Sequence, residues 1–106
     1  MQTDRKIMVE FSEATAATFA AIAAQGVGTH IEIDQVVLNP DGGVNTITLD
    51  FGAIAPVFVL DDAQALVLDA PDKNPYQVDH NTAFNITLSA ATAVSGFIMA
   101  RVVGEN

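Results

Sequence analysis

Apolar residues recur at every second position in several short runs of this chain, and a period of two is typical of β-strands rather than helices. The pattern is clearest in THIEIDQVVLN (29–39), where Ile31 and Ile33 alternate with acidic residues and the series continues at Val36 or Val37. The slip of phase before these valines indicates a bulge or a twist. The segment therefore predicts a strand with one buried and one exposed face.

Six further segments show the same alternation or a short apolar run bounded by turn residues. They are RKIMVEF (5–11), VNTITLDFG (44–52), AIAPVFVL (53–60), ALVLD (65–69), FNITL (84–88) and VSGFIMARVV (94–103). The first places Ile7, Val9 and Phe11 on one face and is predicted to be an edge strand. Pro56 places the third near an edge or a bend, because proline donates no hydrogen bond to a ladder.

The connections between these strands are predicted from turn residues. The sequence NPDGG (39–43) is a strong turn signal, and the polar stretch 70–81 is the longest predicted loop. The last two strands, 84–88 and 94–103, are predicted to pair as a closing hairpin. In that hairpin SAATA (89–93) forms the turn or a bulged approach to it, and the side chains that point inward are Phe84, Ile86 and Leu88.

About seven or eight short strands with frequent turn signals predict an all-β fold, an antiparallel β-sandwich or jelly roll. The chain has 106 residues, the size of one domain. We expect residues 12–106 to form a single β-sandwich domain. Residues 1–11 form an N-terminal segment that is either an arm reaching a neighbouring subunit or an edge strand of the same domain.

The segment SEATAATFAAIAAQ (12–25) is ambiguous. Its alanines favour a helix, Ser12 could cap the N-terminus, and Gly26 could follow the C-terminus. Phe19 and Ile22 are three residues apart, as the apolar stripe of a helix requires, and they share one face of a strand only if a bulge separates them. Helix and strand both remain open for this segment.

Acidic residues outnumber basic ones by thirteen to four, and the formal net charge is −9. Binding to nucleic acid or to an anionic membrane requires clustered lysine and arginine, so neither partner is expected. No stretch approaches the length of a membrane span, and the N-terminus has no apolar run typical of a signal peptide. We therefore expect the chain to be used in a cytoplasm or assembled there into a larger structure.

The residue types that carry chemistry do not form a recognisable site. A hydrolase triad needs a histidine near a nucleophile and a carboxylate. His30 lies in the approach to a strand, and His80 follows Asp79 in the polar loop, but an Asp-His neighbour pair is common by chance. The absence of cysteine excludes thiolate metal sites. Tyr76 alone cannot provide the aromatic platform of a sugar-binding groove.

Calcium is the inorganic ligand best suited to the loop carboxylates, but their spacing matches no EF-hand loop. These carboxylates belong to Asp61, Asp62, Asp69, Asp72 and Asp79. We predict no catalytic, cofactor-binding or metal-binding residues, and no enzyme activity.

Three segments carry a resemblance to a known group of proteins. They are TFAAIAAQGVG leading into THIEIDQVVLNPDGG, the central ITLDFGAIAPVFVL, and the terminal FNITLSAATAVSGFIMARVV. From about Thr18 to Val103 the chain resembles small jelly-roll or sandwich virion proteins of tailed bacteriophages, which decorate or cement the capsid and have relatives at tail and fibre tips. The resemblance implies that TFAAIAA (18–24) is an extended strand.

The resemblance also implies a function. It indicates a decoration or cement protein on the outer surface of a phage capsid, assembled in the host cytoplasm, with the major capsid protein as its partner. Such a protein works by burying surface between subunits, and lattice junctions favour a homo-oligomer, most simply a trimer. The alternatives are a receptor- or carbohydrate-binding module of a tail tip or fibre, and a small cupin-like enzyme, which would require clustered histidines.

Overall fold

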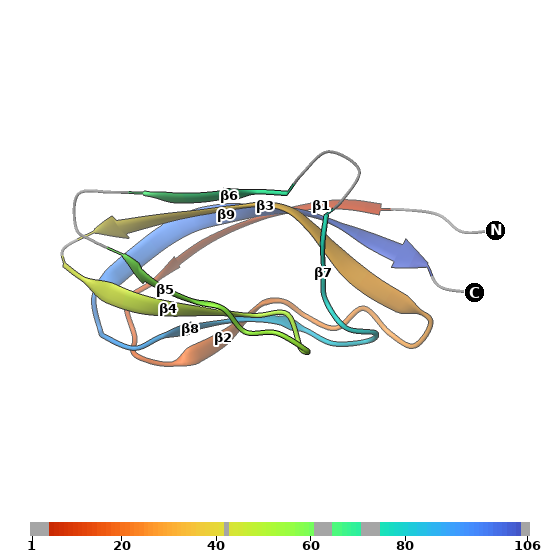
Figure 1. Ribbon diagram of the computed structural model, residues 1–106, viewed down its shortest axis with the longest axis horizontal. Coiled ribbons are helices and arrows are strands. Elements are labelled where there is room, and N and C mark those ends of the chain that lie inside the picture. The colour runs from red at the N-terminus through yellow and green to blue at the C-terminus, as the bar shows by residue number, and fades with distance from the viewer. Residues whose placement is uncertain (1–4, 42, 61–64, 71–74, 105–106) are drawn as a thin grey trace.

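The computed structural model describes residues 5–41, 43–60, 65–70 and 75–104. In these residues the chain forms two antiparallel sheets packed face to face, shown one above the other in Figure 1. Sheet A has the strand order β1-β9-β3-β6, with β7 also paired to β3, and sheet B has the order β2-β8-β4-β5. The predicted all-β antiparallel sandwich is therefore confirmed, with nine strands in the part of the chain described.

Sheet A holds the three longest strands together with two short ones, and the strands of sheet B have four to six residues. Sheet A contains β1 (Arg5–Glu13), β3 (Thr29–Asp41), β6 (Leu66–Asp69), β7 (Tyr76–Gln77) and β9 (Ala93–Gly104). Sheet B contains β2 (Thr18–Ile22), β4 (Asn45–Asp50), β5 (Val57–Leu60) and β8 (Phe84–Leu88). Strand β1 lies at one edge of sheet A and pairs with β9 of the same chain along its whole length.

The core lies between the sheets and is built from every second side chain of the central strands. Its fully buried members are large aliphatic residues and one phenylalanine: Ile31, Ile33, Val36, Leu38, Ile47, Leu49, Val78, Phe84, Ile86, Leu88, Val94 and Ile98. The inward direction of the three predicted residues of β8 is confirmed. The Phe84 ring packs on Phe51 with ring centroids 5.1 Å apart. Removing this apolar surface from water is the main stabilising term of such a fold.

Both predicted irregularities are present. The pairing of β3 with β9 shifts register between Ile33 and Gln35, so Val36 rather than Val37 continues the buried series. The pairing of β2 with β8 shifts between Ala20 and Ile22. This second shift brings Ile22 into the core on the same side as Phe19, which is partly buried against it.

The helix considered for residues 12–25 is wrong. Strand β1 continues to Glu13, and Thr18–Ile22 forms β2, as the resemblance implied. The local preference of alanine for helix is weak, and tertiary packing overrides it. Here the bulge in β2 allows a three-residue spacing of apolar side chains to serve a strand.

The predicted closing hairpin is also wrong, because its two strands lie in different sheets. Strand β8 pairs with β2 and β4 in sheet B, whereas β9 pairs with β1 and β3 in sheet A. Residues 89–92 therefore cross between the sheets. Both strands face the same interior, so their alternation would be identical in a hairpin and in such a crossing.

Two connections differ in extent from the prediction. Strand β3 runs to Asp41, so Asn39 and Pro40 of the predicted turn are still paired with β9. Within the predicted loop 70–81, β7 adds to the edge of β3 and Val78 is fully buried. The N–H of Val78 donates to the carbonyl of Ile31 at 2.8 Å, which holds this segment against the sandwich.

Candidate protein-binding face

The outer face of sheet A is the most distinctive surface of the described chain. The pairing registers of β1, β9, β3 and β6 align its side chains in rows across the sheet. Two central rows read Met8–Met99–Gln35–Asp69 and Glu10–Phe97–Val37–Val67. They are flanked by the rows Lys6–Arg101–Glu32 and Ser12–Ser95–Asn39.

Five apolar side chains of the central rows form what we call the apolar patch: Met8, Val37, Val67, Phe97 and Met99. Met8 is 65% exposed, Val67 51% and Met99 42%. Met8 lies directly opposite Met99, and Phe97 directly opposite Val37. A contiguous apolar centre within a polar border is typical of a protein-binding surface, where methionine and aromatic residues are enriched.

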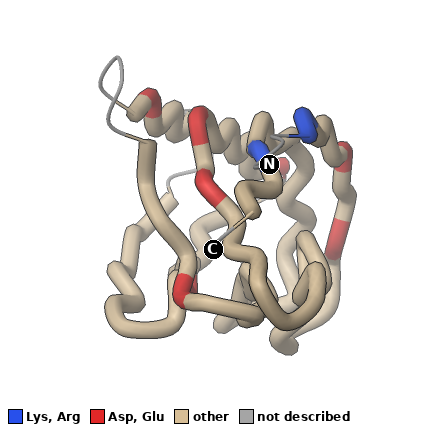
Figure 2. Tube along the Cα trace, turned by 90° about the vertical axis from the view of Figure 1, so that its right-hand side faces the viewer, with Lys and Arg blue, Asp and Glu red and all other residues tan. Residues whose placement is uncertain are grey.

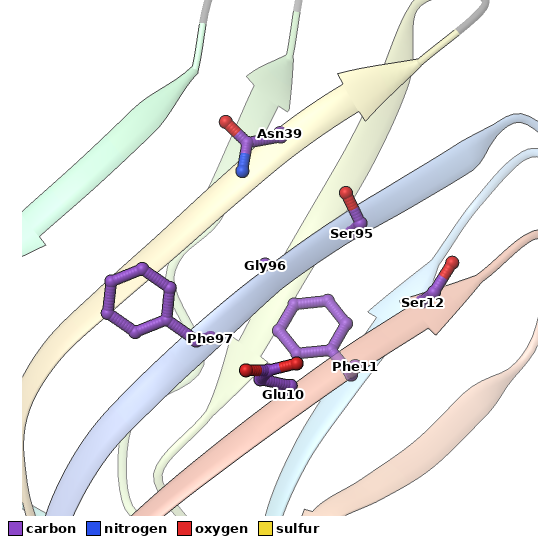
Figure 3. A pocket seen from close by; sticks show the side chains of 7 residues that line it. All are labelled: Glu10, Phe11, Ser12, Asn39, Ser95, Gly96 and Phe97. Carbon is purple, nitrogen blue, oxygen red and sulfur yellow. The ribbon is translucent and has the colours of Figure 1, made fainter.

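Two open hollows lie beside this patch. The larger, of about 550 Å³, is lined by Glu10, Phe11, Ser12, Asn39, Ser95, Gly96 and Phe97. Figure 3 shows Glu10 and Phe97 beside the short side chains of Ser12, Ser95 and Asn39. The second, of about 440 Å³, is lined by Lys6, Ile7, Met8, Asp34, Met99 and Ala100. Side chains of a partner could enter these hollows, which would improve shape complementarity.

Charged groups at one end of the face pair with one another. The Arg101 guanidinium donates to both carboxylate oxygens of Asp34, at 3.0 and 3.2 Å, and lies 3.5 Å from Glu32. The other oxygen of Glu32 lies 2.8 Å from Nε2 of His30, which is buried. Charges on half-exposed side chains contribute little to stability, but they direct how a charged partner approaches.

The residues singled out in the sequence do not converge on a chemical site. His30 contacts Glu32, and His80 is exposed in the turn after β7. Asp69 accepts a hydrogen bond from Gln35, and Asp79 packs beneath Gly52. The other candidate calcium ligands, Asp61, Asp62 and Asp72, lie outside the described residues. Among the residues described, no group of three or more histidine or acidic side chains could hold a metal ion.

Tyr76 does not form an aromatic platform. Its ring packs against Phe51 with centroids 6.0 Å apart, and its hydroxyl donates to the carbonyl of Asp69 at 3.4 Å. Over the ranges that the structure describes, no helix is long and apolar enough to cross a membrane.

The apolar patch was not predicted from the sequence. The sequence does show apolar residues at positions of these strands that point outward. Only the pairing of β1, β9, β3 and β6 brings these residues together on one surface.

Comparison with known proteins finds no matching family model and no matching curated protein. Among solved structures, the chain is similar to a chain of the virus-like particle of extra small virus of the giant freshwater prawn Macrobrachium rosenbergii, solved by cryo-EM. The TM-score is 0.50 and the sequence identity is 12%, over 99% of this chain and 80% of that chain. The similarity supports the β-sandwich fold found in a viral particle protein, and it does not bear on tailed bacteriophages in particular.

Proposed function

We propose that this protein is a structural component of a virion that acts by binding other protein subunits through the outer face of sheet A. The observation that carries the proposal is the apolar patch, whose exposed methionines lie between rows of polar and charged residues. Exposed apolar surface of this kind is costly unless a partner covers it. The fold shared with a viral particle protein supports a role in a particle.

In its finer form, the proposal is a decoration or cement protein on the outer surface of a phage capsid. Its partner is the major capsid protein, and a homo-oligomer, most simply a trimer, suits the three-fold junctions of a lattice. The net charge of −9 favours a shell surface with basic patches, because complementary charge speeds encounter and sets orientation. A binding role of this kind requires no catalytic group and no cofactor.

The test is co-sedimentation of the purified protein with empty shells assembled from the major capsid protein of the same genome. We expect saturable binding at a fixed ratio to the shell subunits. The double variant Met8→Glu, Met99→Glu is expected to bind at least about tenfold more weakly, because it places two carboxylates in the centre of the contact.

Val27→Glu provides the matched control. Val27 is 87% exposed and lies between β2 and β3, away from the apolar patch, so this apolar-to-acidic change is expected to leave binding unchanged. Failure of the unaltered protein to bind shells would overturn the decoration role. Equal binding by the unaltered protein and the double variant would overturn the assignment of the face.

A further inference from the structure

The edges of the two sheets differ in how readily they could accept another strand. One edge of sheet A consists of the short strands β6 and β7, and the edges of sheet B are β2 and β5. Strand β5 has four residues and directly follows Pro56, and β2 contains a bulge. Short edge strands, prolines and bulges all discourage pairing with another chain. Strand β1 has none of these features, because its nine residues keep one unbroken register with β9 and include no proline.

Charge is arranged along β1 so that its two ends have opposite signs. Arg5 and Lys6 begin the strand, and Glu10 and Glu13 lie in its second half. Figure 2 shows blue at the basic end, close to the N-terminus. Lys6, Met8 and Glu10 are exposed on the outer face of sheet A. When two copies of such a strand run antiparallel, each basic end lies beside the acidic end of the other copy.

We propose that the free edge of β1 pairs antiparallel with β1 of a second copy of this chain. In the register that we infer, Met8 lies opposite Met8 of the second copy. Lys6 of each copy then lies opposite Glu10 of the other, and the two ion pairs flank the central methionines. The pairing spans residues 5–11 of each copy, with a hydrogen-bonded pair at every second position.

The neighbouring register fits the side chains less well. Opposite residues of an antiparallel pair lie on the same face of the sheet. A register centred on Val9 would place Arg5 opposite Glu13, but it would also place Met8 of each copy opposite Glu10 of the other. The register centred on Met8 therefore matches charge with charge and apolar with apolar on the exposed face.

The same register joins apolar side chains on both faces of the sheet. On the inner face, Ile7 lies opposite Val9 of the other copy, and both residues are partly buried against the core. On the outer face, the row Met99–Met8 of one copy continues into Met8–Met99 of the other, so the two apolar patches become one surface. This inference goes beyond the proposed function and does not rest on it, because a monomer and a dimer can both present the patch to a shell.

A second copy suits this edge for reasons of charge and symmetry. Each copy has a net charge of −9, so most contacts between copies bring acidic groups together. Strand β1 holds two of the four basic residues of the chain, and its pairing places opposite charges together instead. Contact through the same strand occupies both edges and closes at two copies. Strand addition relies on main-chain hydrogen bonds, and we expect a reversible dimer with a dissociation constant of about 10–1,000 μM.

Cysteine cross-linking tests the pairing and its register together. The chain contains no cysteine, so a single introduced thiol can form a protein disulfide only with its counterpart in another copy. Directly opposite residues of an antiparallel pair have Cα atoms about 4.5–5.5 Å apart, which is within the range of a disulfide. Met8→Cys at about 1 mM in a glutathione redox buffer is therefore expected to give a disulfide-linked dimer as its main product.

Ser12→Cys is the matched control. Ser12 is exposed on the same face of β1, but in the proposed register the Ser12 residues of the two copies lie about 27 Å apart, from the rise per residue of a strand. This variant is expected to remain monomeric under the same conditions. Equal cross-linking of the two variants, or none of Met8→Cys, overturns the proposed pairing.

Reversal of charge tests the ion pairs. Lys6→Glu and Glu10→Lys each place like charges opposite one another, and each is expected to weaken the dimer by at least about tenfold in sedimentation equilibrium. The double variant exchanges the two charges, keeps the net charge of −9 and is expected to restore the affinity. Glu10→Lys makes each copy less acidic, so an association limited only by net charge would instead become stronger.

Circular dichroism of the variants confirms that they fold. An unaltered protein that stays monomeric at about 1 mM overturns the proposal, because the expected dissociation constants do not exceed that concentration. So does an oligomer that the single charge variants leave unchanged, or one that the double variant fails to restore. Each of these results would leave the shell-binding proposal intact, because that proposal is tested by co-sedimentation.

Discussion

Replacing Gly96 with alanine is expected to lower the free energy of unfolding by about 3 kcal/mol, because the new methyl group has no space. A Cβ atom at this position would lie 1.8 Å from the carbonyl oxygen of Val37 and 2.9 Å from its carbonyl carbon. These are backbone atoms of the neighbouring strand β3, so no side-chain rotation relieves the clash. The ring of Phe11 closes the site on the other side at 3.3 Å.

The clash falls in the most extensive pairing of the molecule, that between β9 and β3. Strands held apart at Gly96 would lose hydrogen bonds on both sides of that position. For a domain of this size, a loss of about 3 kcal/mol lowers the melting temperature by about 15 °C. Urea unfolding followed by circular dichroism measures the change directly.

Ser95→Ala is the matched control for this experiment. Ser95 is the preceding residue of β9 and lies on the outer face of sheet A, where its side chain lines the larger hollow. Its replacement is expected to change stability by less than about 0.5 kcal/mol. A Gly96→Ala protein that unfolds at the same urea concentration as the Ser95→Ala protein would show that β9 and β3 do not approach as closely as described.

The sequence predicted the fold well wherever alternation alone decides it. Strands β3 and β8 each bury one face, and the phase of their apolar residues determines which face that is. Even the bulge in β3 is visible, because the series Ile31, Ile33 and Val36 changes phase once. Burial of large side chains is the dominant stabilising term, so the strongest apolar pattern is also the most reliable one.

Alternation cannot determine which strands are neighbours. In a sandwich, strands of both sheets face one interior, and β8 and β9 therefore have the pattern of a hairpin although they lie in different sheets. Because alternation does not determine which strands are neighbours, the apolar patch could not be predicted from the sequence. Met8 and Met99 are distant in sequence, and only the pairing of β1 with β9 places them opposite one another.

A polar residue in a buried position is equally difficult to predict. In β4 the inward series is Asn45, Ile47 and Leu49, so an asparagine rather than the adjacent Val44 points into the interior. Val44 is 55% exposed. Hydrophobicity gives no reason for this choice. The reason lies in residues 89–92, which cross between the sheets close to Asn45 and present backbone groups that require partners.

Asn45→Asp is expected to lower the free energy of unfolding by about 4 kcal/mol. The reason is that the asparagine side chain acts as both hydrogen-bond donor and acceptor for the backbone of residues 89–92. Its Nδ2 donates to the carbonyls of Ala90 and Thr92 at 2.9 and 3.0 Å. Its Oδ1 accepts from the N–H groups of Ser89 and Ala90, each at 3.1 Å. Aspartate keeps the acceptor but replaces the donor with an oxygen, which then faces two carbonyl oxygens.

The variant also places a negative charge in a site that is 1% exposed, where the side chain is surrounded by backbone groups of residues 89–92 and the Ser89 hydroxyl. Asn39→Asp makes the same chemical change at an exposed position of β3 and is expected to cost less than about 0.5 kcal/mol. Urea unfolding of the two variants at neutral pH separates the effect of burial from that of the substitution. Equal urea midpoints for the two proteins would contradict this prediction. They would mean that the hydrogen bonds between Asn45 and residues 89–92 do not contribute measurably to stability.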